Sequence, residues 1–183
     1  MVLPNDLSEY LARLYAVVKR RVFISYHHGG DQVYYDAFSR TFHDGYEAIF
    51  DNSLERQIDS DDANYVMQRI RDEFISGTSF TIVLCGANTP WRKYVDWEIK
   101  ATLDKGHGII GVELPSCAKN FQSQSMVPGR LFDNIQSGYA VWTTWAHLIQ
   151  NIVNLKTLGE VAVAKSASSI QNSREMMARN MTV

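Results

Sequence analysis

The sequence lacks the marks of a membrane protein or a secreted protein. No apolar run approaches the ~20 residues that a membrane-spanning helix needs. Asp6 and Glu9 interrupt the N-terminal residues before any apolar segment, so no signal peptide is expected. Cysteine is scarce, and Cys85 and Cys117 are not a spaced pair, which predicts free thiols in a reducing compartment. Together these absences predict a cytoplasmic protein that has no membrane partner.

The sequence also lacks a surplus of either charge. Its 18 Lys and Arg residues nearly balance its 20 Asp and Glu residues, which argues against nucleic acid as the main partner. No repeat or low-complexity linker divides the 183 residues, and 45% of them are apolar, so one domain with a sizeable core is expected. His27 and His28 are adjacent, but no third ligand lies at a suitable spacing, so no metal site is expected.

The sequence does contain an alternation of strand and helix patterns. Short apolar runs predict five strands, at 22–26, 46–50, 80–84, 109–114 and 139–142. Apolar residues at helical spacing predict helices between these strands. This alternation predicts an α/β fold with a parallel, doubly wound sheet, and five strands suit the flavodoxin-like order 2-1-3-4-5.

Both ends of the chain fall outside this alternation. One helical pattern precedes the first strand, and the residues after the last helical pattern are rich in Ala, Ser and Met. We therefore expect an N-terminal helix, an α/β domain and a C-terminal helical or mobile tail, at 1–19, 20–158 and 159–183. Within the domain, residues 115–130 are expected to be irregular, and residues 145–158 are expected to form a single helix.

One strand–helix–strand unit, from Thr78 to Leu114, carries the most informative residues. Thr89 is a candidate N-cap and Pro90 suits the first helical position, so a helix is expected to start there. The carboxylate of Glu98 lies on this helix next to two aromatic side chains. Apolar residues at every fourth position give the helix one buried face: Trp91, Val95, Ile99 and Leu103.

A ligand crevice is expected at the carboxyl ends of the first and third strands. Open parallel sheets bind ligands at the point where the strand order reverses. The segments Tyr26–Asp31 and Gly86–Trp91 would border this crevice, with Asp51 and Asn52 one strand away. Glu98 would lie two helical turns from its edge.

Four segments at this edge of the sheet resemble one protein family. They are Arg-Val-Phe-Ile-Ser-Tyr-His from Arg21, Phe-Asp-Asn-Ser from Phe50, Trp-Arg-Lys-Tyr-Val-Asp-Trp-Glu-Ile from Trp91 and Lys-Gly-His-Gly-Ile-Ile-Gly-Val from Lys105. In this order and spacing they resemble the TIR-like family that includes the TIR subunit of Thoeris antiphage systems. The resemblance covers about half of the chain, from Arg20 to Leu114, and it implies a flavodoxin-like fold.

The resemblance implies a catalytic role for one carboxylate. Catalytic members of the family cleave the nicotinamide–ribose bond of NAD⁺ with a helical glutamate, and the matching residue here is Glu98. The family has tryptophan four positions before this glutamate, whereas this chain has Tyr94. Around Glu98 we expect a set of substrate-binding side chains: Ser25, Tyr26, His27, Asp51, Asn52, Trp91, Tyr94 and Trp97.

The resemblance also implies a signalling role. Antiphage members of the family make a cyclic or otherwise modified ADP-ribose that activates a separate effector. NAD⁺ would then be a substrate, and no cofactor is expected. The implied partners are NAD⁺, an effector protein reached through the diffusible nucleotide, a phage-derived trigger and other copies of the chain.

One carboxylate is sufficient for this chemistry. Departure of nicotinamide leaves an oxocarbenium-like centre at the ribose C1′, and the pyridinium leaves as a neutral molecule without a general acid. Glu98 can accept hydrogen bonds from the ribose hydroxyls and stabilise the positive charge as it develops. Backbone N–H groups at the start of the helix, together with Arg92 or Lys93, are candidate donors to the pyrophosphate.

Two other interpretations remain open at this point. The first is a non-catalytic TIR-like adaptor that acts by self-association or nucleotide binding, with Glu98 outside any pocket. The second is a deoxyribosyltransferase-like nucleoside enzyme, which also uses a glutamate on a flavodoxin-like sheet. A glutamate on an amphipathic helix is usually a solvated surface residue, and tryptophans such as Trp91 and Trp97 are usually core or interface residues.

Overall fold

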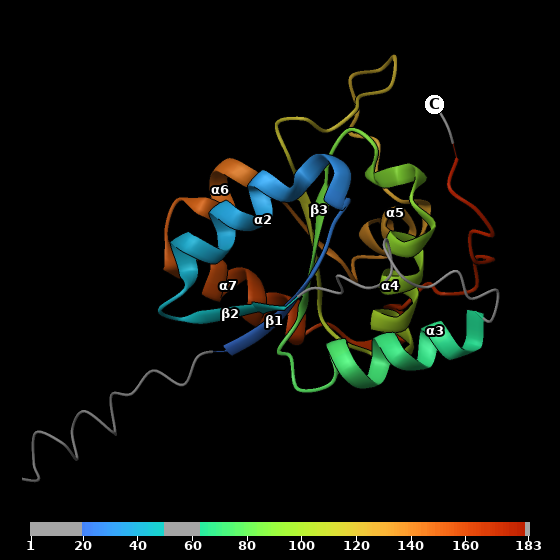
Figure 1. The fold of residues 1–183 in the computed structure, drawn as a ribbon, viewed down its shortest axis with the longest axis horizontal. Coiled ribbons are helices and arrows are strands. Elements are labelled where there is room, and N and C mark those ends of the chain that lie inside the picture. The colour runs from blue at the N-terminus through green and yellow to red at the C-terminus, as the bar shows by residue number, and fades with distance from the viewer. Residues whose placement is uncertain (1–19, 50–62, 182–183) are drawn as a thin grey trace, which may run out of the picture.

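The computed structural model describes residues 20–49 and 63–181, which form an α/β domain around one parallel sheet (Figure 1). Its strands lie in the order β2-β1-β3-β4-β5, and neighbouring strands are parallel. The predicted flavodoxin-like order is confirmed, with strand ends displaced by only one or two residues. The strands are β1 (Arg20–Ser25), β2 (Tyr46–Ile49), β3 (Thr81–Cys85), β4 (Ile109–Glu113) and β5 (Val141–Thr144).

Helices cover both faces of this sheet (Figure 1). One face carries α2 (His28–Phe42), α6 (Trp145–Ile149) and α7 (Ile152–Val163). The other face carries α3 (Ala63–Arg69), which continues as the π-helix η1 (Ile70–Ile75), and then α4 (Lys93–Asp104) and α5 (Gly129–Gln136). Because side chains alternate along a strand, Val22 and Ile24 of β1 face the first layer, whereas Phe23 and Ser25 face the second.

Two helices differ from the sequence prediction at their ends. The helix that carries Glu98, α4, begins at Lys93 rather than at Pro90, and a separate 3₁₀ turn, η2 (Thr89–Trp91), precedes it. The helix expected over 145–158 is two helices, α6 and α7. The break occurs because Asn151 Oδ1 accepts a hydrogen bond from Asn154 N at 2.9 Å and thereby caps a new helix.

The segments after β4 and after α7 differ most from the prediction. The region expected to be irregular ends in α5, which begins directly after Pro128. After the short 3₁₀ turn η3 (Ala167–Ser169), the tail has neither helix nor strand as far as residue 181 and lies along α4 and α5. We call residues 171–181 the C-terminal strap. No helix forms there because the polar groups of the strap bond to α4 and α5 instead of to their own backbone.

Several predictions fall outside the described residues. These are the N-terminal helix over 1–19, the last residue of the second strand and the loop that holds Asp51 and Asn52. Of the helices in the described part of the chain, none has both the length and the apolar character needed to cross a membrane.

Candidate active site

The carboxylate of Glu98 lies against the end of β1. Ser25, the last residue of β1, is fully buried, and its Oγ donates a hydrogen bond to Glu98 Oε2 at 2.6 Å. Glu98 itself is only 5% exposed, because α4 buries every side chain from Val95 to Ile99. The solvated surface glutamate considered above is therefore excluded. A carboxylate this buried is retained only where hydrogen bonds compensate for its lost hydration.

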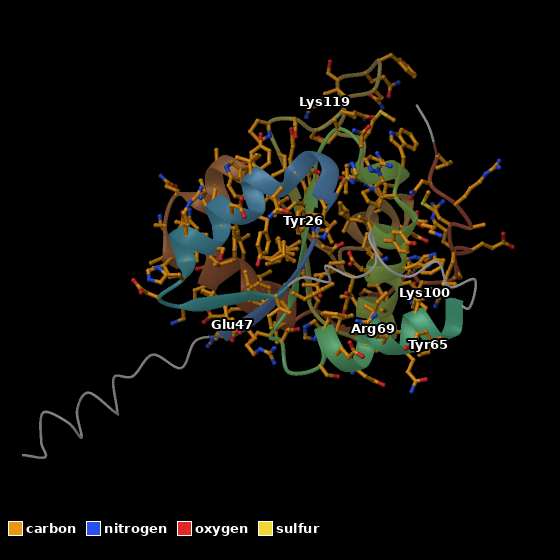
Figure 2. All side chains as sticks on the ribbon, viewed as in Figure 1. Tyr26, Glu47, Tyr65, Arg69, Lys100 and Lys119 are labelled. Atoms are coloured by element: carbon orange, nitrogen blue, oxygen red, sulfur yellow. The ribbon has the colours of Figure 1, made fainter. Side chains whose placement is uncertain are left out.

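Tyr26 and His27 follow Ser25 but take different directions. Tyr26, labelled in Figure 2, is 3% exposed and lies on the α2 side of the sheet. Its hydroxyl donates to Gln32 Oε1 at 2.8 Å, and its ring stacks on Tyr35. It is therefore on the opposite face from the Ser25–Glu98 pair. His27 is half-buried at the N-cap position of α2, with its ring folded over the first turn, where Gly29 leaves room for it.

Three aromatic residues precede or flank Glu98 on η2 and α4. Trp97 is 5% exposed, packs with Phe23 in the core and donates a hydrogen bond from Nε1 to the strap carbonyl of Met177 at 2.9 Å. Tyr94 meets Trp97 edge-on, with ring centroids 5.8 Å apart. Trp91 and Tyr94 remain partly exposed, so these two, rather than Trp97, are accessible to a ligand.

A buried contact joins the two segments that border the predicted crevice. Thr89 Oγ1 donates to Asp31 Oδ2 at 3.0 Å and accepts from the backbone N–H of Gly86 at 2.9 Å. Asp31 is 2% exposed, and Thr89 is fully buried. Thr89 was expected from the sequence to cap a helix, not to contact Asp31. The signal that could have paired them is their position, since polar residues just beyond the ends of two neighbouring parallel strands lie at the same sheet edge.

Substitution of Gly86 by alanine is expected to strain this contact. A Cβ at Gly86 would lie 2.0 Å from Asp31 Oδ1, so Asp31 and Thr89 would have to move. We expect Gly86→Ala to lower the free energy of unfolding by about 1–3 kcal/mol, measured by urea denaturation. In Gly30→Ala the new Cβ would have only ordinary contact with His27, at 3.4 Å, so this control should change stability little. Equal stability of the two variants would contradict the tight packing of Asp31 on Gly86.

Two positively charged side chains lie at the start of α4. Lys93 Nζ lies 4.8 Å from the ring centroid of Tyr94 and 5.4 Å from that of Trp97. Arg92 Nε is buried and has no hydrogen-bond partner among the described residues. Buried donors without a partner are rare in native proteins, so Arg92 is a candidate to bind an anion at this helix start.

The cysteines do not offer a second reactive centre. Both are free. Burial raises the pKa of the Cys85 thiol well above its usual value and also raises that of Cys117. Both thiols are therefore protonated at neutral pH, and a protonated thiol is a poor nucleophile.

A groove of about 770 Å³ lies beside this site rather than over Glu98. It runs between the strap, α5 and the loop that follows β4, and its lining includes Trp91 but neither Ser25 nor Glu98. Its apolar lining consists mainly of Trp91, Met126, Phe132, Trp142, Met177 and Met181.

The structure brings only some of the predicted site residues together. Glu98 contacts Ser25, and Tyr94 contacts Trp97. Trp91 lies at the groove, and Tyr26 lies on the other face of the sheet. Asp51 and Asn52 lie outside the described residues.

Comparison with known proteins identifies one family from the sequence and several distant matches among solved structures. Residues 23–119, just over half of the chain, match the family described as Thoeris protein ThsB, TIR-like domain. No curated protein matches in sequence. A solved structure that matches is that of the TIR domains of the activated Roq1 resistosome, which directly recognizes the pathogen effector XopQ. Its identity is 12%, its TM-score is 0.38, and the match covers 79% of this chain and 82% of that one.

Proposed function

Because the chain belongs to the TIR-like domain family of the Thoeris protein ThsB, we propose that it cleaves the nicotinamide–ribose bond of NAD⁺ at Glu98. The observation that carries this proposal is the buried contact between Ser25 and Glu98 at the carboxyl end of β1. It holds one carboxylate in a fixed orientation at the sheet edge where open α/β folds bind ligands. Such a fixed, poorly hydrated carboxylate stabilises a developing positive charge more strongly than one in water.

The proposed reaction breaks the bond between the ribose C1′ and the pyridinium nitrogen. The electron pair of this bond leaves with the nitrogen, so nicotinamide departs as a neutral molecule and the ribose becomes oxocarbenium-like. Glu98 stabilises this charge and accepts hydrogen bonds from the ribose hydroxyls. Attack by water gives ADP-ribose and a proton, whereas attack by a nucleophile of the same molecule gives a cyclic product and attack by another acceptor gives a conjugate.

In this proposal the neighbouring side chains have separate roles. Trp91 and Tyr94, which are partly exposed, contact the substrate, and Arg92 donates to the pyrophosphate. Ser25 orients Glu98, and Trp97 supports the helix from its buried side. His27, Asp51 and Asn52 are proposed as further substrate contacts because they follow the first and second strands in the sequence.

The biological role that we propose follows the family. The product is a cyclic or otherwise modified ADP-ribose, which diffuses in the cytoplasm and activates a separate effector in antiphage defence. A phage-derived trigger and self-association of the chain belong to the same proposal. They rest on family membership alone.

One observation favours a second candidate function. The groove of about 770 Å³ has Trp91 in its lining but does not include Glu98. A non-catalytic adaptor that binds a nucleotide or another copy of itself would use such a groove and would not need an accessible carboxylate. The two functions differ in a single property, which is the release of nicotinamide from NAD⁺.

The test is NAD⁺ turnover by the purified full chain, with and without lysate of phage-infected cells. We expect nicotinamide release together with a second product whose mass identifies the reaction. The mass of ADP-ribose indicates hydrolysis, a mass lower by one water indicates cyclisation, and a higher mass indicates conjugation. Absence of nicotinamide release under both conditions would overturn the proposal in favour of the adaptor. Turnover of free nucleosides but not of NAD⁺ would instead indicate a deoxyribosyltransferase-like enzyme.

A further inference from the structure

The C-terminal strap is anchored on α5 by its first residues. Arg130 of α5 is fully buried, and its guanidinium donates to Asn172 Oδ1 at 2.8 Å and to the carbonyl of Glu175 at 3.2 Å. Asn134, one turn later, exchanges two hydrogen bonds with the backbone of Gln171. A buried guanidinium needs such partners, so this half of the strap is part of the folded domain.

The last residues of the strap reach the start of α4. The backbone N–H of Met177 donates to Asp96 Oδ2 at 3.0 Å, and its carbonyl accepts from Trp97 Nε1. Asn180 Oδ1 accepts from the backbone N–H of Lys93 at 2.9 Å. The N–H of Met181 donates to the carbonyl of Trp91 at 3.0 Å.

Asn180 supplies what α4 lacks in its own sequence. The residue at the N-cap position of α4 is Arg92, which makes no side-chain capping hydrogen bond. The first N–H groups of a helix have no partner within the helix, and asparagine is among the best residues to accept from one of them. Asn180 does this from 87 residues along the chain.

We propose that residues 177–181 are a positioning element for the candidate active site. Asn180 caps α4, Met181 binds the carbonyl of Trp91, and together they hold Trp91 and Tyr94 at the start of the helix that carries Glu98. The proposal rests on the proposed function for its kinetic consequence, but its structural part does not. The hydrogen bonds of this element go to Trp91, Lys93, Asp96 and Trp97, which lie before Glu98 in the sequence. Within residues 20–49 and 63–181, the Glu98 carboxylate accepts a hydrogen bond from Ser25.

Because the strap contacts residues before Glu98 and Ser25 holds Glu98 itself, loss of the strap contacts should change one kinetic constant and not the other. Glu98 is held by Ser25 and by the buried neighbours Val95 and Ile99, so release of Asn180 leaves its carboxylate in place. Trp91 and Tyr94 are partly exposed; Tyr94 lies in the first turn of α4, and Trp91 ends η2 directly before it, where its carbonyl accepts from the N–H of Met181. Loss of the cap therefore weakens substrate binding and leaves the chemical step nearly unchanged.

The experiment compares Asn180→Ala with Ser173→Ala in the full chain. Ser173 is an exposed polar residue of the same strap, so it controls for loss of a polar side chain. Two quantities are measured, namely the hydrogen-exchange rate of the Lys93 N–H by NMR and the KM and kcat for NAD⁺. We expect Asn180→Ala to raise the exchange rate about five-fold, as for loss of a typical cap, and to raise KM several-fold with kcat within two-fold.

A third variant, Asn180→Asp, tests whether the side-chain oxygen at position 180 is the group that caps α4. Asn180→Asp keeps an oxygen at the same position and is expected to restore the wild-type exchange rate of Lys93. Exchange that is equal in Asn180→Ala and wild type, or an unchanged KM despite faster exchange, would overturn the positioning role. A wild-type protein that releases no nicotinamide would overturn the proposed function. In that case the exchange rates still show whether Asn180 caps α4.

Discussion

Substitution of Glu98 by glutamine is expected to lower kcat/KM for nicotinamide release by about 10²–10³-fold, the usual cost of removing one electrostatic contact with a transition state. The expected cause is loss of the negative charge opposite the ribose C1′. Glutamine has the same shape and keeps an oxygen that can accept from Ser25 Oγ, so the fold should be retained. The measurement is the rate of nicotinamide release at low NAD⁺ concentration, with circular dichroism as the check on folding.

A matched control distinguishes the effect of Glu98 at the site from the effect of removing one negative charge anywhere on the protein. Glu160→Gln on α7 removes the same charge from an exposed position. There Glu160 Oε1 lies 3.9 Å from Lys156 Nζ, which is a long and exposed ion pair. This variant should cleave NAD⁺ at the wild-type rate. If Glu98→Gln retains activity equal to that of Glu160→Gln, Glu98 is not the reacting carboxylate.

The second large effect concerns stability. Arg130 pairs with Asp96, with Nε–Oδ1 at 3.0 Å, and the side chains of the two residues are 0% and 4% exposed. Arg130→Ala would leave the Asp96 carboxylate buried without its opposite charge and would also release Asn172 and Glu175 of the strap. We expect the free energy of unfolding to fall by about 3–5 kcal/mol, measured by urea denaturation.

The strap offers its own control for this stability prediction. Arg174 makes two hydrogen bonds to Asp133, at 2.8 and 2.9 Å, but its side chain is 49% exposed. Exposed pairs of this kind contribute about 0–1 kcal/mol, so Arg174→Ala should change the free energy of unfolding far less than Arg130→Ala. Similar losses in the two variants would mean that the buried pair has no special role in holding the strap.

The sheet was predictable from sequence, but the start of α4 was not. Buried parallel strands appear as short continuous apolar runs, and the alternation of such runs with helical patterns left few possible topologies. Thr89 and Pro90 matched the local rule for a helix start. The prediction of that start was wrong because Thr89 bonds to Asp31, a residue far away in the sequence, and local rules carry no information about such contacts.

Only part of the candidate site was predictable from the sequence, because the direction of each side chain depends on how the elements pack. Ser25 and Glu98 were both chosen from sequence, and the structure places them in contact. Tyr26 was also expected around Glu98, but consecutive residues of an extended chain point to opposite faces, and Tyr26 packs in the core on the α2 side of the sheet. Trp97, chosen as a substrate contact, is buried between the core and the strap. Its role in substrate binding stays a prediction that activity measurements must test.

The sequence did not predict α5 or the C-terminal strap, and both contain residues whose positions are fixed by contacts with distant parts of the chain. α5 places a charged residue, Arg130, at a fully buried position, which breaks the apolar pattern by which helices are found. The strap has no periodic pattern, since its residues are ordered by bonds to Asp96, Arg130 and Asn134. A local stretch of sequence does not show which distant residues will form these contacts.

The distance along the chain between α4 and its cap has a consequence for folding kinetics. Lys93 and Asn180 are 87 residues apart, so their contact closes a long loop of chain, and contacts of this kind slow folding. The strap also follows every strand of the sheet in the sequence. On the ribosome, the sheet and α4 therefore emerge before the residues that complete the first turn of α4. We expect docking of the strap to be a late folding step.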